Sequence, residues 1–426
     1  MLISQRPMPN ELPSIQFGTS ISLSNRSDSI LKAGIVSVFL SDTVFSRFGI
    51  NIGNSFFLDF SLIALYILLA CILFSGYFRI DRRSAILYGA SVCFGSISYL
   101  FNIGNSSISS LLLLFAVYFP FIITVPNKIP SETLWKWAAE AFSNIALFCA
   151  IAGIVQFFAQ TVIHDKWLFD FRYLLPDIIR LESGFNTIIP MGTLFKSNGF
   201  FIREPSGFSE LMAFALVFEL ALRRRGMRIM TYGLGLLLSY SGSGILIILI
   251  AFLFPLNYKS VFRYLFLSGA AGLILWLLGD ALNLWFIVDR ASEFNSEQSS
   301  AYARFIAPFR LLVDTLTTDP WNPFLGHGPG MISRTVLSYG FHDPTYVKLL
   351  FEYGACGAIV MIANVAFACT RSTAPVRIKA MFFFTWLIFG GGLLTTGGTT
   401  SLMYVFLAIW PLSRPTMQSA EMTGKL

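Results

Sequence analysis

Histidine is rare in this chain and is confined to two polar stretches between long apolar runs, at about residues 164–206 and 282–345. One of the three histidines, His342, stands with Asp343 immediately before an apolar run that begins near residue 345. A histidine with an ordinary pKa of about 6.5 is largely neutral at working pH and accepts a proton from a weak nucleophile such as a hydroxyl group. His342 is therefore a candidate general base, with Asp343 as the fallback, although a lone loop histidine is more often structural. The alternative is that protonated His342 binds an anion.

The second polar stretch contains arginine but no lysine, although Lys259 and Lys348 flank it. A guanidinium group is planar and binds phosphate or carboxylate through two parallel hydrogen bonds, so this choice of cation favours recognition of such an anion. Pairing of each arginine with an acid of the same stretch is the simpler alternative. The four arginines are Arg290, Arg304, Arg310 and Arg334.

Arg203 and Glu204 come near the end of the first polar stretch, directly before a predicted helix that starts around Pro205. Proline is common at the first position of a helix, and the N-terminal end of a helix attracts anions through its dipole. Arg203 and Glu204 are therefore expected at the boundary between water and lipid. Both an anion site and a surface ion pair between the two residues fit this pattern.

The apolar runs that flank these stretches indicate an integral membrane protein, because 55% of the residues are hydrophobic and only 12% are charged. About 20 apolar residues cross the roughly 30 Å hydrocarbon core, and helices satisfy their own backbone groups there. We therefore expect an all-α, polytopic protein with about twelve transmembrane helices. The runs lie near residues 30–48, 56–77, 84–104, 107–125, 138–163, 207–222, 229–254, 264–281, 345–367, 380–396 and 399–413.

Basic residues cluster between the runs, and such clusters mark cytoplasmic loops. All the clusters fall on one side only if the run at 229–254 crosses the membrane and returns. The motif SYSGSG at 239–244 lies in the middle of that run, so we expect two short helices or a re-entrant hairpin rather than one straight span. The chain then forms a single transmembrane domain at 30–413, between a loose cytoplasmic tail at 1–29 and a second at 414–426. Both polar stretches then face outward.

Cysteine placement and net charge exclude two other classes of protein. The five cysteines fall inside apolar runs or within two residues of the end of one, so neither a disulfide framework nor a Cys-x-x-Cys metal site is indicated. The formal charge of +7 is explained by basic cytoplasmic loops, so no nucleic acid partner is expected. The outer stretches have no clustered carboxylates or metal-ligand spacing, so the chain is predicted to need no metal or other cofactor.

Five short motifs follow one another between about residues 195 and 360. They are Arg-Glu-Pro-Ser before a helix, a Ser-x-Ser turn, Ser-x-x-x-x-Arg ending at Arg304, Gly-x-Gly-x-Gly at 326–330, and His342 before a helix with Glu-x-Gly at 352–354. In this order, and on a common side of the membrane, they resemble the O-antigen polymerase and O-antigen ligase superfamily. Two positions depart from its pattern: many members have Arg where Gly242 stands and Asn where Asp343 stands.

The resemblance implies a membrane glycosyltransferase that works without a metal. Such an enzyme takes a glycan from a polyprenyl diphosphate donor and passes it to a hydroxyl of a glycan acceptor on the outer, periplasmic face of the bacterial cytoplasmic membrane. By motif, the resemblance implies catalytic roles for Arg203, Arg304 and His342, with Arg290 as a weaker rival for the second arginine. The residues expected to bind substrate are Glu204, Arg290 and Asp343.

The Arg-Glu-Pro-Ser helix start is closer to polymerases, so the favoured function is polymerisation of lipid-linked oligosaccharide repeats into O-antigen or exopolysaccharide. The alternatives are an O-antigen ligase, which would transfer the glycan to lipid A core, and a transporter or flippase, which is less favoured. The partners implied are the lipid-linked donor, the glycan acceptor, the lipid bilayer, a flippase and a chain-length regulator.

Overall fold

A computed structural model describes most of the chain and is mostly helical. Among the described residues, four helices are long and apolar enough to cross a membrane, which supports a multi-pass membrane protein. These four helices are Arg82–Phe101, Glu132–Ala159, Pro205–Leu222 and Thr345–Thr370. The described residues are 18–51, 57–126, 131–180, 186, 188–189, 193–254, 262, 269, 273, 296–297, 299–316, 319–335, 339–389, 393–395 and 397–411.

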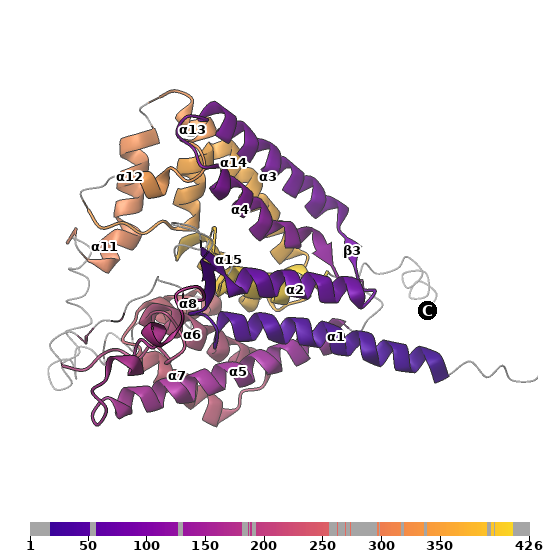
Figure 1. Cartoon of the computed structure of the whole chain (residues 1–426), viewed down its shortest axis with the longest axis vertical. Coiled ribbons are helices and arrows are strands. Elements are labelled where there is room, and N and C mark those ends of the chain that lie inside the picture. The colour runs from indigo at the N-terminus through magenta and orange to yellow at the C-terminus, as the bar shows by residue number, and fades with distance from the viewer. Residues whose placement is uncertain are drawn as a thin grey trace, which may run out of the picture.

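The first two helices form an antiparallel pair. α1 (Gly18–Asp42) packs along α2 (Phe60–Phe74), and the hairpin of β1 (Gly49–Asn51) and β2 (Phe57–Asp59) connects them. α5 (Ser131–Ala159) lies against α1 on its other side (Figure 1). This arrangement brings the end of α1 and the end of β2 to the same place in the fold.

The N-terminal tail was predicted to be loose as far as residue 29, and this is wrong for residues 18–29, which belong to α1. The prolines that mark the tail end at Pro13, and no proline interrupts the chain from Gly18 to Asp42. Once the apolar part of α1 is packed on α2, the helix can therefore extend upstream through the polar residues. Propagation adds one hydrogen bond for each residue that is fixed.

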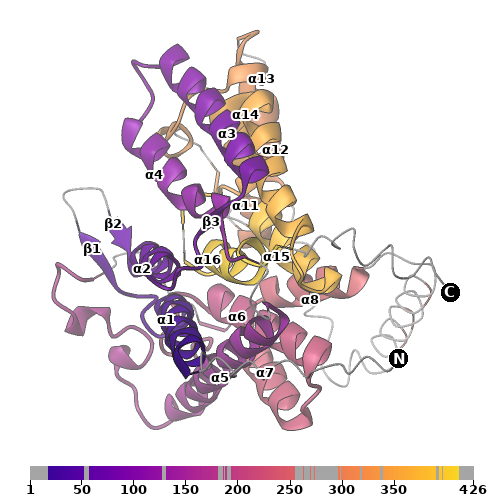
Figure 2. The same ribbon diagram turned by 90° about the vertical axis from the view of Figure 1, so that its right-hand side faces the viewer.

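Figures 1 and 2 both show two groups of helices, with α3, α4, α12, α13 and α14 at one end of the molecule and α1, α5, α6 and α7 at the other. The most extensive contacts in the first group are between α3 and α14, and in the second between α6 and the pair α7 and α8. The first group comprises α3 (Arg82–Phe101), α4 (Ile108–Tyr118), α12 (Ala307–Leu316), α13 (Asn322–Leu325) and α14 (Thr345–Thr370). The second adds α6 (Pro205–Leu222), α7 (Gly226–Leu238) and α8 (Ser243–Leu253).

The predicted break at 239–244 is confirmed. α7 ends at Leu238 and α8 starts at Ser243, with Tyr240 at a positive φ of 46° between them. At 1.5 Å of rise per residue the two helices are only about 20 Å and 17 Å long, so neither crosses the hydrocarbon core fully. Serines fasten the break to α6, because Ser243 Oγ donates to Ser206 O at 3.1 Å and Gly244 N donates to Ser209 Oγ at 3.1 Å.

The C-terminal segment runs through the centre of the molecule. α16 (Thr399–Met403) continues into the π-helical turn η6 (Tyr404–Ala408), and every residue of Thr400–Trp410 is buried. The Phe406 ring lies 4.5 Å from that of Phe218, and the Phe406 carbonyl accepts from Trp135 Nε1 at 2.9 Å. The remaining elements are β3 (Arg79–Ile80) paired with β4 (Ile123–Thr124), α11 (Ser300–Phe305), α15 (Val376–Ile388), and the 3₁₀ turns η1 (Phe119–Ile122), η2 (Lys166–Leu168), η3 (Arg172–Leu174) and η5 (Ile332–Arg334).

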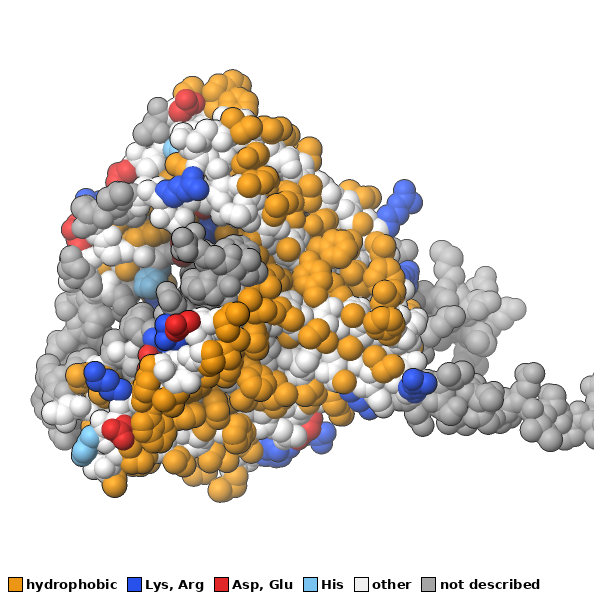
Figure 3. Space-filling model, in the orientation of Figure 1, with side chains coloured by type: hydrophobic (Ala, Val, Ile, Leu, Met, Phe, Trp, Pro, Cys, Tyr) orange, Lys and Arg blue, Asp and Glu red, His pale blue; other side chains and the backbone are white. Residues whose placement is uncertain are grey.

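The surface agrees with a protein that lies in lipid. Figure 3 shows hydrophobic side chains in a broad band from top to bottom of this face, with charged side chains along its left and right edges. Exposed large hydrophobics include Phe74, Leu100 and Val155, whose exposed fractions are 78%, 64% and 61%. Exposure of so much apolar area is unfavourable in water and favourable in a bilayer.

α14 is interrupted at Gly354, which has φ 64° and ψ −175°, and the Gly-x-Gly-x-Gly loop fits against the interruption. Gly328 N donates to Glu352 O at 2.9 Å, and a Cβ on Gly354 would overlap the backbone of Phe324 and Leu325. Glycine is therefore needed at position 354 for two reasons: the backbone has an unusual conformation there, and another chain segment comes too close for a Cβ.

Gly354→Ala is expected to destabilise the protein by about 3 kcal/mol or more, because strain at this φ/ψ adds to the overlap. The measurement is thermal unfolding of the detergent-purified protein. Gly89→Ala is the matched control, since no atom lies within 4 Å of a Cβ at this exposed helical position. Equal unfolding temperatures for the two variants would contradict the fit of loop and helix described above.

Candidate functional site

Arg203 lies at the start of α6 and is fixed by the first hairpin. Its Nε donates to Ser46 O at 2.6 Å, and its Nη2 donates to Asp59 Oδ1 at 3.1 Å. The ion pair of Arg203 is therefore with Asp59, 144 residues away in sequence, rather than with Glu204. The surface pair of Arg203 with Glu204, one of the two alternatives from the sequence, is wrong.

Glu204 is the N-cap residue of α6, with extended backbone, and Pro205 occupies the first helical turn as predicted. The carboxylate of Glu204 accepts a hydrogen bond from Ser206 Oγ at 3.1 Å. Its negative charge stands at the N-terminal end of the helix, where the dipole of α6 stabilises it. Glu204 is thus held at the mouth of the site as an acceptor of hydrogen bonds.

Arg304 projects from the short helix α11. Ser299 caps this helix, because its Oγ accepts from Tyr302 N at 3.1 Å. No hydrogen bond or ion pair holds the Arg304 side chain within the described part of the chain. Its charge acts on Glu210 of α6 and on His342, so the three groups are neighbours. Arg304 is a cation that a bound anion can reach.

His342 is brought beside Arg304 by backbone pairing. His342 N donates to Ala303 O at 3.0 Å, and Gly340 N donates to Glu297 O at 3.3 Å, so the segment before α14 runs along α11. The side chain reaches solvent, yet the surrounding protein and the charge of Arg304 lower the pKa of His342, while Glu204 and Asp343 oppose this change. The neutral imidazole, which a general base requires, is favoured.

The remaining two predicted residues contribute less. Asp343 is paired, because its Oδ2 accepts a hydrogen bond from Lys348 Nζ at 2.8 Å, so this oxygen is engaged within the protein. Arg290 lies outside the described residues. Of the six predicted residues, Arg304 and Glu204 are near enough for their charges to act on His342, whereas the side chain of Arg203, next to Glu204 in sequence, is directed to Ser46 and Asp59.

The structure adds three acids that the sequence did not single out. A cavity of about 310 Å³ beside Arg203 and Glu204 is also lined by Asp42, Asp59 and Glu210. Glu210 lies inside an apolar run, and an ionisable residue within a membrane helix is by itself a signal of function. Asp42 and Asp59 also lie inside apolar runs, at 30–48 and 56–77, so the same signal was present for them.

The other two histidines lie elsewhere. His327 N donates to Phe351 O at 2.8 Å, and its ring packs on the Phe351 ring at 4.5 Å, so His327 belongs to the loop that fits against α14. His164 lines a separate cavity of about 610 Å³ in the first outer stretch, together with Lys166 and Asp170. Neither is close to the group around His342.

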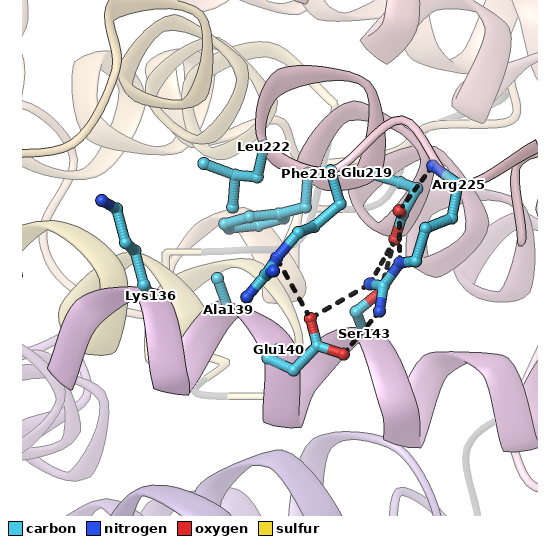
Figure 4. Close-up of a pocket in the computed structure, with 9 residues that line it drawn as sticks. Lys136, Ala139, Glu140, Ser143, Phe218, Glu219, Leu222 and Arg225 are labelled. Carbon is cyan, nitrogen blue, oxygen red and sulfur yellow. Dashed lines mark hydrogen bonds and ion pairs between the residues drawn. The ribbon is translucent and has the colours of Figure 1, made fainter. Parts of the chain in front are cut away.

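A second group of charged residues lies at the far end of α6, in a pocket of about 350 Å³ (Figure 4). Arg225 Nε donates to Glu219 Oε1 at 2.7 Å, and Arg225 Nη1 donates to Glu140 Oε1 at 2.7 Å. These bonds raise the pKa of Arg225. The network joins α5, α6 and the start of α7, so it stabilises the packing of these helices at the end opposite the site.

The arrangement around His342 has the parts for transfer to a hydroxyl group. The pKa of His342 is lowered, Arg304 is an accessible cation, and the neighbouring cavity is lined by acids that can accept hydrogen bonds. No group of three or more His, Cys, Asp or Glu side chains suited to a metal ion occurs among the described residues. No protein-family model matches the chain, and no curated protein matches it.

Proposed function

We propose that this protein is a membrane glycosyltransferase of the O-antigen polymerase type. It joins polyprenyl-diphosphate-linked oligosaccharide repeats into a longer glycan on the outer face of the bacterial cytoplasmic membrane. The proposal is supported most by one observation: the charges of Arg304, from the second outer stretch, and of Glu204, from the first, both act on His342, near the N-terminal ends of two membrane-length helices.

The topology of the proposal has about twelve membrane segments with both chain ends in the cytoplasm. The ion-pair network of Arg225 then lies on the cytoplasmic side and the group around His342 on the outer side, separated by the length of α6. Eighteen residues span about 27 Å along the helix axis, close to the thickness of the hydrocarbon core. The lipid tail of the donor lies against the apolar helices, and its sugars reach the aqueous mouth.

Glycan transfer needs one bond to form and one to break. The acceptor hydroxyl oxygen bonds to the anomeric carbon of the donor, the bond from that carbon to the diphosphate oxygen breaks, and the diphosphate leaves with the electron pair. Its growing negative charge is stabilised by Arg304, with a smaller part for Arg203. The hydroxyl proton passes to the neutral ring of His342.

The decisive experiment is the pattern of glycans in a strain from which the gene is deleted. A polymerase mutant keeps single lipid-linked repeats, which complementation with wild type converts to a ladder on an SDS gel. A ligase mutant instead keeps long lipid-linked chains. Loss of a transporter or flippase leaves the donor on the cytoplasmic face, where added periplasmic glycosidases do not reach it. Either of the last two patterns would refute the proposal.

The pH dependence of the reaction follows from the charges around His342. Its pKa lies below the ordinary value of 6.5, so activity is expected to persist in mildly acidic solution and to fall only as the pH drops through that lowered pKa. Glu204→Gln removes a negative charge that favours the protonated ring, and the acid limb should move to lower pH. Arg304→Gln removes a positive charge that disfavours it, and the limb should move to higher pH. Initial rates from pH 5 to 8 give the pH–rate profile of each protein. An acid limb at the same pH in both variants would contradict the role of His342.

Chelation is expected to leave activity unchanged, because the proposed stabilisation of the diphosphate uses arginine and no cluster of metal ligands lies among the described residues. The measurement is the rate of polymerisation by purified protein in EDTA. Loss of activity that Mg²⁺ restores would place a metal on the diphosphate and overturn this expectation.

A further inference from the structure

The cavity of about 310 Å³ is enclosed by four parts of the chain that are distant in sequence. The ends of α1 and β2 supply Asp42 and Asp59, and one face of α6 supplies Gly207, Glu210, Leu211 and Phe214 at helical spacing. The segment before α16 closes the opposite side. Arg203 and Glu204 stand at its edge, so the cavity adjoins the group around His342.

The charges that line this cavity do not suit a diphosphate. Four carboxylates face a single cation, Arg203, which is already bonded to Asp59 and to the Ser46 carbonyl. A diphosphate would find only this already bonded cation among the lining residues, whereas Arg304, outside the lining, is accessible. The lining is instead rich in groups that accept hydrogen bonds.

Asp42 points to a missing donor. The residue is only 8% exposed, and its Oδ2 accepts a hydrogen bond from the Ser401 hydroxyl. The Ser61 side chain and the Gly398 backbone also lie near the carboxyl, but no hydrogen bond of good geometry reaches its buried Oδ1 in the part of the chain that the structure describes. A buried carboxylate oxygen without a donor is unfavourable, and a hydroxyl group of a bound molecule would satisfy it.

The wall opposite α6 is built from short residues, which leaves room and backbone groups for a polar ligand. Thr395, Gly397, Gly398 and Thr399 line it, and the space around a Cβ of Gly398 is empty to 4 Å. Leu211 and Phe214 give the cavity an apolar patch beside the polar groups. Polar groups that alternate with an apolar patch fit a sugar ring, whose edges carry hydroxyls and whose faces are apolar.

We infer that this cavity binds a neutral sugar residue of the glycan, with the hydroxyls of the sugar donating to Asp42 and Glu210, while the diphosphate is held outside it by Arg304. The inference rests on the proposed function and adds to it a division of the site into a sugar half and a diphosphate half. The bound sugar can belong to the acceptor or to the donor.

Binding measured separately for the two halves tests this division. The probes are the free repeat oligosaccharide, released by mild acid from the lipid that accumulates in the deletion strain, and undecaprenyl diphosphate without sugar. Asp42→Asn and Glu210→Gln are each expected to weaken binding of the sugar probe by roughly ten- to a hundred-fold, the effect of losing one hydrogen bond to a charged group. Binding of undecaprenyl diphosphate should be unchanged, and Arg304→Gln should show the reverse pattern.

Controls make each outcome decisive. Asp177→Asn is the matched control, because this acid of the first outer stretch has a side chain that is 83% exposed. Thermal unfolding monitors the fold, and Thr399→Val tests the opposite wall if an acid variant unfolds. If the acid variants weaken binding of the lipid-linked repeat as well as that of the free repeat, the bound sugar is that of the donor; if they weaken binding of the free repeat alone, it is that of the acceptor.

Three results would overturn the inference. The first is sugar binding that is unchanged in Asp42→Asn, Glu210→Gln and Thr399→Val, and the second is equal weakening of binding of both probes. The third would indicate a cation site: NaCl stabilises the wild-type protein against unfolding more than choline chloride does, and Asp42→Asn abolishes this difference while sugar binding stays intact. The proposed function is judged apart from these, by the glycans that accumulate in the deletion strain.

Discussion

His342→Ala is expected to reduce glycan polymerisation by about 10²- to 10⁴-fold, the usual contribution of a general base, and to leave single lipid-linked repeats in a complemented deletion strain. The physical reason is that the attacking hydroxyl is a weak nucleophile until its proton has an acceptor. The His342 ring, with its lowered pKa, is available in the neutral form for that proton. The measurement is the ladder on an SDS gel, quantified against membrane expression of each variant.

His164→Ala is the matched control for this experiment. His164 is also an exposed histidine of an outer stretch, but it lines a different cavity. It should restore the full ladder. A full ladder with His342→Ala, at equal expression, would exclude His342 as the base and reduce the segment before α14 to a packing role.

Arg304→Gln is expected to lower the rate by roughly ten- to a hundred-fold, because one charge-assisted contact to the departing diphosphate is worth about 1.5–3 kcal/mol. Arg304→Lys should restore only part of this, since an ammonium group keeps the charge but not the two-pronged geometry. The effect should appear in kcat more than in KM, because the charge on the leaving group grows in the transition state. Initial rates with purified lipid-linked repeat measure it.

Arg310→Lys, six residues further along, is the control. Arg310 is engaged at the surface with Glu297 Oε1 at 2.6 Å and with Tyr302 Oη at 2.9 Å, and such exposed pairs contribute little to stability. This variant should keep wild-type rates. Wild-type rates with both Arg304→Lys and Arg304→Gln would remove the arginine from the account of leaving-group stabilisation.

Substitution of Arg203 is expected to have a different effect from substitution of Arg304, although the resemblance implies a catalytic role for both residues. Its side chain bonds Asp59 and the Ser46 carbonyl, so its loss would release the hairpin of β1 and β2 and leave a carboxylate unpaired. Substitution of Arg203 therefore mixes loss of structure with loss of charge. For this reason Arg304 gives the cleaner test of diphosphate stabilisation.

The class of protein and several local features could be predicted from the sequence because they depend on residues near one another in the chain. Apolar composition sets the membrane environment, and Pro205 marks the start of α6. Glycine and serine at 239–244 break the helix between α7 and α8, as predicted. The motifs likewise indicated where chemistry-bearing residues stand along the chain, since residue type and position relative to apolar runs are local properties.

The tertiary structure alone decided which charges are neighbours. Arg203 pairs with Asp59 rather than with adjacent Glu204, and Asp343 pairs with Lys348, because the choice of partner depends on where the packed elements place each side chain. Backbone pairing of 340–342 with α11 put His342 beside Arg304. Asp42 met Ser401 across 359 residues, and with Glu210 it came to line a cavity. Sequence periodicity acts within one helix, whereas such contacts arise only when distant elements pack together.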